Sequence, residues 1–222
     1  MTVLYLFDID GTLLHAHGSG RGAFDAIMRE LFGIDDASNG IRYGGKTDPQ
    51  IVGEIFAARL GRPPTEAEQA AFLGAYVPRL RSLLAEHGVE VLAGVREALA
   101  FLKAQRELVR LGVATGNIKE GAAAKLEVAG LDHWFDVGGY GCDSATRAEL
   151  VARAIERGRE GREVREVVVV GDTIYDIAAA RACGATVAAV ATGSDPADRL
   201  ADADAVFSSM TQLPAWHASR FG

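Results

Sequence analysis

A pair of acidic residues follows the first apolar segment of the chain. Residues 3–7 form a continuous apolar run, and Asp8 and Asp10 come after it, followed by Gly11 and Thr12. Such a run is typical of a strand that is buried on both faces. Two neighbouring carboxylates repel each other and resist burial unless a cation or a substrate lies beside them. Because the glycine lets the backbone turn and present N–H groups, the pattern indicates a metal and phosphate site, although Asp-Gly also occurs in ordinary turns.

A second acidic pair follows the clearest strand pattern in the chain. Four consecutive valines at 167–170 predict a strand at the centre of a sheet, and Asp172 and Asp176 come after it. The carboxyl ends of parallel strands meet at one edge of a sheet, so we expect Asp172 to lie near Asp8 and Asp10. Asp176 falls one helical turn further on and can support a metal ion or a basic residue. A helix cap followed by a surface acid would give the same local pattern.

A hydroxyl and an amide follow a third predicted strand. This strand is expected at residues 108–114, and it ends in Thr115, Gly116 and Asn117. In isolation these residues would suit a helix cap. At the carboxyl end of a strand, however, Thr115 and Asn117 can offer a hydroxyl and an amide to a phosphate. We therefore interpret residues 115–117 as a phosphate-binding loop.

In combination, these patterns resemble the sequence motifs of the haloacid dehalogenase-like (HAD) hydrolases, a superfamily made mostly of phosphatases. Residues 8–12 resemble the first motif, Thr115 the second, and residues 171–176 the fourth. The third motif is usually a lysine that steadies the nucleophile and the phosphate. This chain has Arg147 about where that lysine belongs, and Lys125 is an alternative that lies earlier in the chain. Arginine keeps the positive charge, but its reach and geometry differ from those of lysine.

The resemblance also implies a role for each residue. Asp8 is expected to attack phosphorus and form an aspartyl-phosphate, and Asp10 to act first as general acid and then as general base. Mg²⁺ is the expected cofactor, since it suits a site with oxygen ligands only and few of them from protein. Its implied ligands are Asp8, the backbone carbonyl of Asp10, and Asp172. Asp176 and Thr12 are expected to support the residues that bind the metal and the phosphate.

The pattern of predicted elements divides the chain into two parts. From residue 91 onward strands and helices alternate, whereas residues 19–88 show helical patterns with no strand between them. An all-helical block inserted after the first strand cannot lie within the sheet. We therefore predict an α/β fold: a HAD-type Rossmannoid core of residues 1–15 and 91–222, with a parallel sheet flanked by helices, and an all-helical cap of residues 16–90. Two details are expected as well. Pro78 should kink or divide the third helix of the cap, and residues 196–201 should form a helix.

Basic residues and glycines lie between the first two predicted cap helices. Segment 42–48 contains Arg42, a glycine pair and Lys46, and it leads into the start of a helix. This combination suits an anion, although a plain loop with solvated charges would look the same. In HAD hydrolases of this layout, the corresponding segment faces the active site and selects the substrate. The resemblance favours Lys46 over Arg42 as the cation that faces the substrate.

The composition argues against several other classes of protein. The chain of 222 residues has a net charge of −7, which does not suit a general nucleic-acid binder. Its apolar fraction of 49% is enough to bury a sizeable core. With only two cysteines, a disulfide framework is not expected, and a reducing cytosol fits. No signal or membrane-spanning segment is visible, so we expect a cytoplasmic monomer or small homo-oligomer without nucleic-acid or membrane partners.

The predicted function is hydrolysis of a small phosphomonoester, of the phosphoglycolate or sugar phosphate type, by a Mg²⁺-dependent phosphatase. Asp10 argues against a dehalogenase, which needs no acid at that position, and against a phosphonatase, which is expected to lack the second aspartate. A phosphosugar mutase of the same fold retains every motif and stays an alternative. A catalytically weak binding protein of this fold is another, because Arg147 is an atypical third motif.

Overall fold

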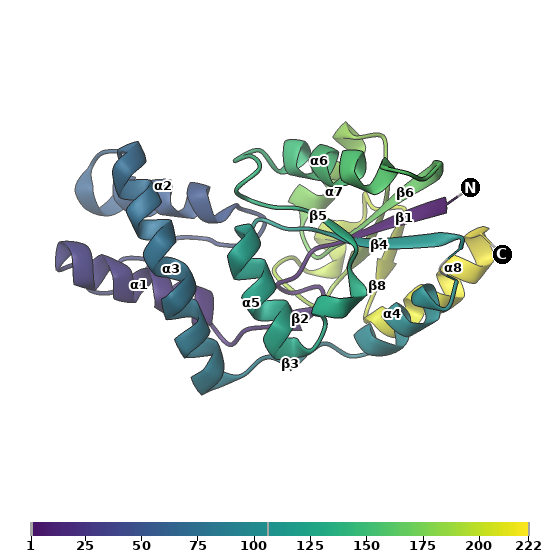
Figure 1. The fold of residues 1–222 in the computed structure, drawn as a ribbon, viewed down its shortest axis with the longest axis horizontal. Coiled ribbons are helices and arrows are strands. Elements are labelled where there is room, and N and C mark those ends of the chain that lie inside the picture. The colour runs from purple at the N-terminus through teal and green to yellow at the C-terminus, as the bar shows by residue number, and fades with distance from the viewer. Residues whose placement is uncertain (1, 106, 222) are drawn as a thin grey trace.

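A six-stranded parallel sheet forms the centre of the molecule, with the strand order β5-β4-β1-β6-β7-β8 (Figure 1). The computed structural model describes residues 2–105 and 107–221. Residues 1, 106 and 222 of the predicted core lie outside the described residues. The strands of the sheet are β1 (Thr2–Phe7), β4 (Val109–Ala114), β5 (Val137–Gly139), β6 (Val164–Gly171), β7 (Thr186–Val190) and β8 (Ala205–Phe207). The predicted α/β fold with a parallel sheet is confirmed.

Helices cover both faces of the sheet, and the alternation of β1 shows why. Tyr5 and Phe7 point into one hydrophobic cluster, and Leu4 and Leu6 into the other. The first cluster is completed by α4, α5 and α8, and the second by α6 and α7. A strand with period-two side chains needs apolar residues at every position when both faces are covered. These helices are α4 (Val95–Lys103), α5 (Lys119–Ala129), α6 (Arg147–Arg159), α7 (Ile174–Ala182) and α8 (Leu213–Phe221).

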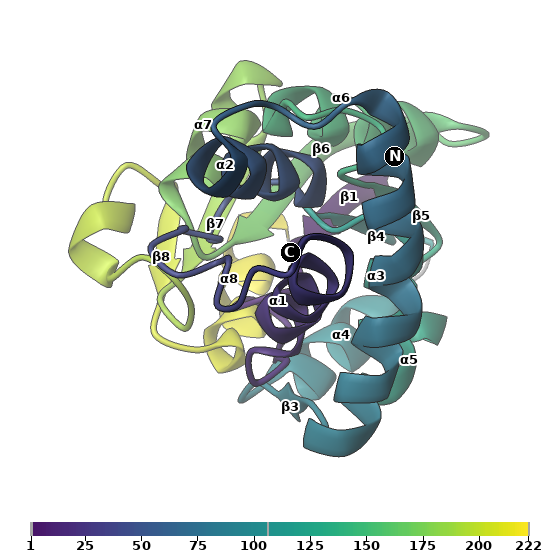
Figure 2. The same cartoon turned by 90° about the vertical axis from the view of Figure 1, so that its left-hand side faces the viewer.

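Three further helices lie together at one end of the molecule, opposite both termini (Figure 1). They are α1 (Ser19–Phe32), α2 (Asp48–Leu60) and α3 (Glu66–His87). The chain enters and leaves this α1–α3 segment through β2 (Leu14–His15) and β3 (Glu90–Val91), which pair antiparallel. Figure 2, viewed from this end, shows α1 and α2 beside α3, and α3 also packs against α5.

Two predicted details of the elements differ from the structure. Helix α3 begins with a capping box at Thr65 and continues through Pro78. The predicted break of this helix at Pro78 is therefore wrong. The helix expected at 196–201 is the 3₁₀ helix η2 (Ala197–Leu200), in which the amide of Arg199 donates to the carbonyl of Pro196. A segment this short closes i to i+3 hydrogen bonds more readily than an α-helical turn.

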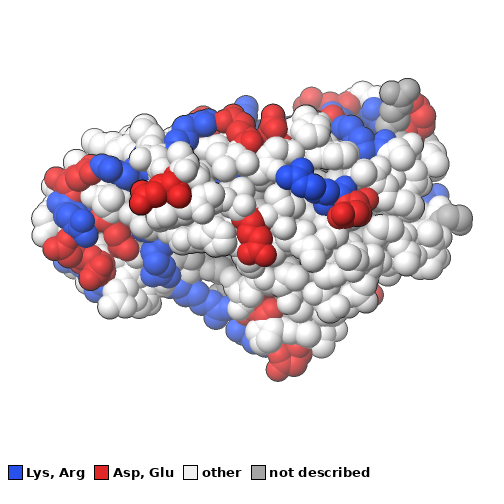
Figure 3. Space-filling model, turned by 90° about the horizontal axis from the view of Figure 1, so that it is seen from below, with Lys and Arg blue, Asp and Glu red and all other residues white. Residues whose placement is uncertain are grey.

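The surface in Figure 3 carries Lys and Arg side chains interspersed with Asp and Glu and with large uncharged areas. Within the described residues, no helix combines the length and the apolar character needed to cross a membrane.

The first residue of α2 joins the α1–α3 segment to the sheet. The amide of Asp48 donates to the carbonyl of Gly116 over 2.8 Å, and Asp48 Oδ2 accepts from the amide of Ile118 over 2.8 Å. Gly116 has no room for a side chain here, since a Cβ would lie 2.1 Å from the carbonyl oxygen of Lys46. The Asp48 carboxyl is buried in this contact, and burial raises its pKa from 3.8 to about 7.

We predict that Asp48 makes the stability of the protein fall as the pH rises. The folded state holds the Asp48 proton up to a pKa of about 7, whereas the unfolded state releases it near 3.8. The contribution of this carboxyl to stability is therefore complete below the unfolded pKa and is lost as the pH rises through the folded one. The variant D48N keeps an oxygen that accepts from Ile118 but cannot ionise, so it should lose less stability than the wild type between about pH 5 and about pH 8.

Thermal or urea unfolding across this pH range measures the effect. The variant D132N removes an exposed carboxylate and serves as the matched control. Equal pH dependence in D48N and the wild type would contradict the prediction.

Candidate active site

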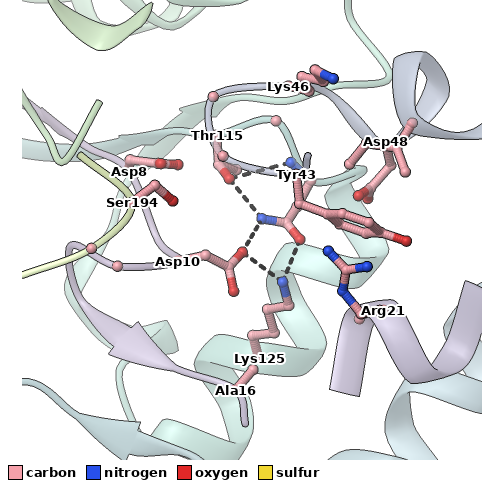
Figure 4. A pocket seen from close by; sticks show the side chains of 18 of the residues that line it. Asp8, Asp10, Ala16, Arg21, Tyr43, Lys46, Asp48, Thr115, Lys125 and Ser194 are labelled. Carbon is pink, nitrogen blue, oxygen red and sulfur yellow. Dashed lines mark hydrogen bonds and ion pairs between the residues drawn. The ribbon is translucent and has the colours of Figure 1, made fainter. Parts of the chain in front are cut away.

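A cavity of about 520 Å³ opens where the carboxyl ends of β1, β4 and β6 face the α1–α3 segment (Figure 4). The sheet contributes Asp8, Asp10, Thr115 and Asp172 to its lining, and α6 contributes Arg147. The strand order places β1 between β4 and β6, so three strand ends meet at this edge. Ligands of doubly wound sheets bind at such a crevice.

Asp8 lies against a buried arginine. Arg147 is the first residue of α6, and its Nη2 lies 2.9 Å from Asp8 Oδ2. Its Nε and Nη2 also donate to Asp176 Oδ1, over 2.9 and 2.6 Å. Burial raises the pKa of Asp8 to about 6, although Arg147 opposes the shift. For Arg147, burial lowers the pKa, but the charges of Asp176 and Asp8 outweigh it and raise the pKa overall. The guanidinium is therefore a permanent charge beside the predicted nucleophile.

Asp172 is held by the loops around it. Its Oδ1 accepts from the hydroxyl of Thr12 over 3.3 Å, and its Oδ2 accepts from the amide of Ser194 over 2.6 Å. Gly193 permits this close approach, because a Cβ there would lie 2.0 Å from Asp172 Oδ2. Thr12 thus contacts Asp172 through its hydroxyl, and its supporting role stays a prediction.

Three carboxylates form a cluster that fits a cation. Asp8, Asp172 and Asp176 each place an oxygen within 4.8 Å of the others. Both oxygens of Asp176 are already occupied, one by Arg147 and the other by the amide and hydroxyl of Thr173. Asp172 also accepts at both oxygens, but from the uncharged donors of Thr12 and Ser194, and Asp8 contacts Arg147 through one oxygen. Asp8 and Asp172 therefore stay the predicted side-chain ligands of an ion. Burial and the neighbouring charges raise the pKa of Asp172 to about 8, and a divalent cation relieves such repulsion. The oxygen donors suit a hard cation, and the backbone carbonyl of Asp10 stays a predicted third ligand.

Asp10 points away from this cluster, toward a lysine (Figure 4). Its Oδ2 accepts from Lys125 Nζ over 2.6 Å and from Asn117 Nδ2 over 2.8 Å. Burial raises the pKa of Asp10, but the charge of Lys125 and these two hydrogen bonds hold it below its ordinary value. The Asp10 side chain keeps 44% of its surface exposed, so it can still reach a molecule in the cavity.

Lys125 is the main residue of the site whose place the sequence did not indicate. It is an alternative for the third motif, but it contacts Asp10, whereas Arg147 contacts Asp8. Lys125 is one of the buried residues of α5, where its neighbours are small or apolar. A lone cation on the apolar face of a helix is the signal that could have found it, because burial of an unpaired lysine is unfavourable.

The predicted phosphate loop lines the cavity. Thr115 follows β4, and its hydroxyl oxygen accepts from Asn117 Nδ2 over 2.8 Å. Thr115, Gly116 and Asn117 all face the cavity, and phosphate binding by them stays a prediction.

The two predicted cap cations already have partners. Lys46 lines the cavity, but its Nζ lies 2.6 Å from Glu54 Oε2. Arg42 Nη2 lies 2.8 Å from Oδ1 of the buried Asp195. This ion pair connects the α1–α3 segment with the loop after β7. The sequence also did not single out Arg21 and Tyr43, which line the cavity with the guanidinium 4.4 Å from the ring centre.

Comparisons with known proteins agree with this geometry. Residues 3–184 match the family model of the haloacid dehalogenase-like hydrolases. The chain is 32% identical to a phosphoglycolate phosphatase of Rhodospirillum rubrum, over 95% of this chain and 89% of that protein. It is 30% identical to a phosphoglycolate phosphatase of Chromobacterium violaceum, over 93% and 92% of the two chains.

A solved structure shares the fold. CbbY from Rhodobacter sphaeroides, crystallised with phosphate, superposes with a TM-score of 0.77 at 22% identity, covering 96% of each chain. The family match spans most of the chain, from the first strand to the helix after the fourth motif. This protein belongs to the haloacid dehalogenase-like hydrolase family of enzymes.

Proposed function

We propose that this enzyme is a Mg²⁺-dependent phosphatase that hydrolyses small phosphomonoesters through an aspartyl-phosphate on Asp8. The observation that carries the proposal is the placement of two aspartates in one cavity in different surroundings. Asp8 lies against the Arg147 guanidinium and near Asp172, whereas Asp10 is bound by Lys125 and Asn117. Two carboxylates whose environments differ in this way suit two separate tasks, one as nucleophile and one as acid and base.

Each residue has a task in this reaction. A carboxylate oxygen of Asp8 bonds to phosphorus as the ester P–O bond breaks, and Asp10 gives a proton to the departing alkoxide. Asp10 takes up that proton from solvent when the negative substrate enters the cavity and raises the pKa of its carboxyl. In the second half of the reaction, water attacks phosphorus of the aspartyl-phosphate while Asp10 removes a proton from that water. This step releases phosphate and restores Asp8. Arg147 and Thr115 hold oxygens of the transferring group.

The proposed metal fits the same arrangement. Asp8, Asp172 and the Asp10 backbone carbonyl would hold Mg²⁺, which supplies positive charge that lets an anionic nucleophile meet an anionic phosphate. Asp176 and Thr12 keep Arg147 and Asp172 in place.

The α1–α3 segment is proposed to act as a cap that completes the cavity and selects the substrate. In this division the cap is residues 16–90 and the core is residues 1–15 and 91–222. Lys46 and Tyr43 contribute to the cavity from the cap side. The proposed substrates are phosphoglycolate or a sugar phosphate. The named activity of the two relatives supports the first of these.

A panel of phosphomonoesters with and without Mg²⁺ tests the function. We expect release of inorganic phosphate, with phosphoglycolate and small sugar phosphates as the best substrates, loss of activity in a chelator, and recovery when Mg²⁺ is added back. Product analysis by NMR distinguishes hydrolysis from conversion into an isomeric sugar phosphate. Metal-independent release, or isomerised sugar without free phosphate, would contradict the proposal.

The variant D8N tests the nucleophile. It should abolish phosphate release, because an amide cannot form the acyl phosphate, while thermal unfolding shows an intact fold. Turnover at the wild-type rate would rule out Asp8 in this role.

The variant R147A tests the atypical third motif. We expect turnover to fall on the order of a hundredfold or more, the effect of losing one preorganised donor to developing charge. Arg153 lies on the same helix, pairs with Glu156 and is exposed, so R153A is the matched control and should keep its activity. A mild effect of R147A would mean that another group neutralises the transferring phosphoryl group.

A further inference from the structure

Lys125 occupies a position that packing alone does not explain. Its side chain is only 5% exposed, and it projects from the second turn of α5, among small and apolar buried residues. Burial of an ammonium is costly unless opposite charge and hydrogen bonds compensate, and an apolar residue at such a place is often as stable. The contacts of this lysine therefore indicate what it does.

Lys125 contacts Asp10 and Asn117, which themselves are hydrogen-bonded to each other. Lys125 Nζ lies 2.6 Å from Asp10 Oδ2 and 2.7 Å from Asn117 Oδ1. The amide nitrogen of Asn117 in turn donates to Asp10 Oδ2 and to the hydroxyl of Thr115, over 2.8 Å in both cases. Because both ends of the Asn117 amide are engaged, its orientation is fixed and its donor stays on Asp10.

These bonds hold Asp10 by one oxygen. Both donors bind Oδ2, and among the described residues Oδ1 has no hydrogen-bond partner. The carboxyl plane is thus set by groups from α5 and from the loop after β4, far from Asp10 in sequence. The start of α1 also lies close: a Cβ on Gly20 would lie 4.0 Å from Lys125 Nζ. Helix α1 therefore closes one side of the lysine.

The two buried cations of the site have separate partners. Arg147 contacts Asp8 and Asp176, whereas Lys125 contacts Asp10 and Asn117. Lys125 is therefore not a second copy of the third motif, and it does not bind the carboxylate that is proposed to attack phosphorus.

We propose that Lys125 is a positioning residue that orients Asp10 for proton transfer to the leaving group. The inference rests on the proposed phosphatase function and extends it to a residue of α5. Proton transfer in the transition state requires the acid to lie within hydrogen-bond reach of the departing oxygen, and a side chain held from two directions meets that requirement with little loss of freedom. Without Lys125, Asp10 keeps a single donor and can rotate away from the leaving group.

The variant K125M tests this role with two substrates of different leaving group. Methionine has a similar length and suits a buried position, but it cannot hold Asp10. An alkyl phosphate needs a proton on its departing oxygen, whereas p-nitrophenyl phosphate releases a stable anion that does not. We expect kcat/KM for the alkyl phosphate to fall on the order of a hundredfold, the usual size of a general-acid contribution, and kcat/KM for p-nitrophenyl phosphate to fall much less.

Lys119 provides a matched control, because it is an exposed lysine on the same helix. The variant K119M should hydrolyse both esters at wild-type rates. Inhibition by inorganic phosphate is measured as well, because Lys125 also contacts Asn117 of the predicted phosphate loop. Weaker phosphate inhibition together with an equal loss for both esters would assign Lys125 to phosphate binding and would contradict the positioning role. If K125M does not fold, K125Q replaces it, since glutamine keeps an N–H donor on a shorter side chain. Its kcat/KM should also fall more for the alkyl phosphate than for p-nitrophenyl phosphate, but by a smaller factor than in K125M.

The outcomes separate the two levels of the proposal. An equal loss for both esters would mean that Lys125 only supports the fold of the site, and an unchanged kcat/KM for the alkyl phosphate would mean that Asp10 does not need it. Either result overturns the positioning role while the phosphatase function stands. Failure of the wild type to release phosphate from either ester would overturn the proposed function itself, and this role with it.

Discussion

Burial of like charges at one edge of the sheet is the constraint on which the site depends. Three buried carboxylates, Asp8, Asp172 and Asp176, and the partly exposed Asp10 lie together there. Such groups stay in a protein interior only when opposite charges, donors or a bound cation compensate each of them. Arg147 serves two of them and Lys125 a third, while hydroxyl and amide donors hold the fourth. The repulsion that remains between Asp8 and Asp172 is what a metal ion would relieve.

The sheet explains how the two cations reach the same edge without sharing a partner. Strand β1 lies at the centre, between the strands that carry Thr115 and Asp172, so the three strand ends form one edge. Helix α5 packs on one face of the sheet and α6 on the other. Lys125 and Arg147 therefore approach from opposite faces. This arrangement keeps the proposed nucleophile and the proposed acid and base in separate electrostatic surroundings although they are two residues apart.

The α1–α3 segment supplies the rest of the cavity and is bound tightly to the loop that follows β4. Asp48 joins the two through its amide and its carboxyl, and Gly116 allows the backbones to approach. Arg42 and Asp195 make a second contact on the other side. The surface that is proposed to select the substrate thus combines side chains from distant parts of the chain. Lys46 lines this surface, but its ammonium pairs with Glu54 of the same segment.

The sequence by itself determined the parallel sheet, its helices, and the placement of Asp8, Thr115 and Asp172 at the strand ends, because apolar runs and the residues directly after them are local signals. It also indicated that Arg147 would reach the site. Only the tertiary structure decided which cation binds which carboxylate. Asp10 and Lys125 are 115 residues apart, and no local pattern links them. Their pairing arises from the packing of α5 against the sheet, which buries the lysine and places its ammonium 2.6 Å from the Asp10 carboxylate.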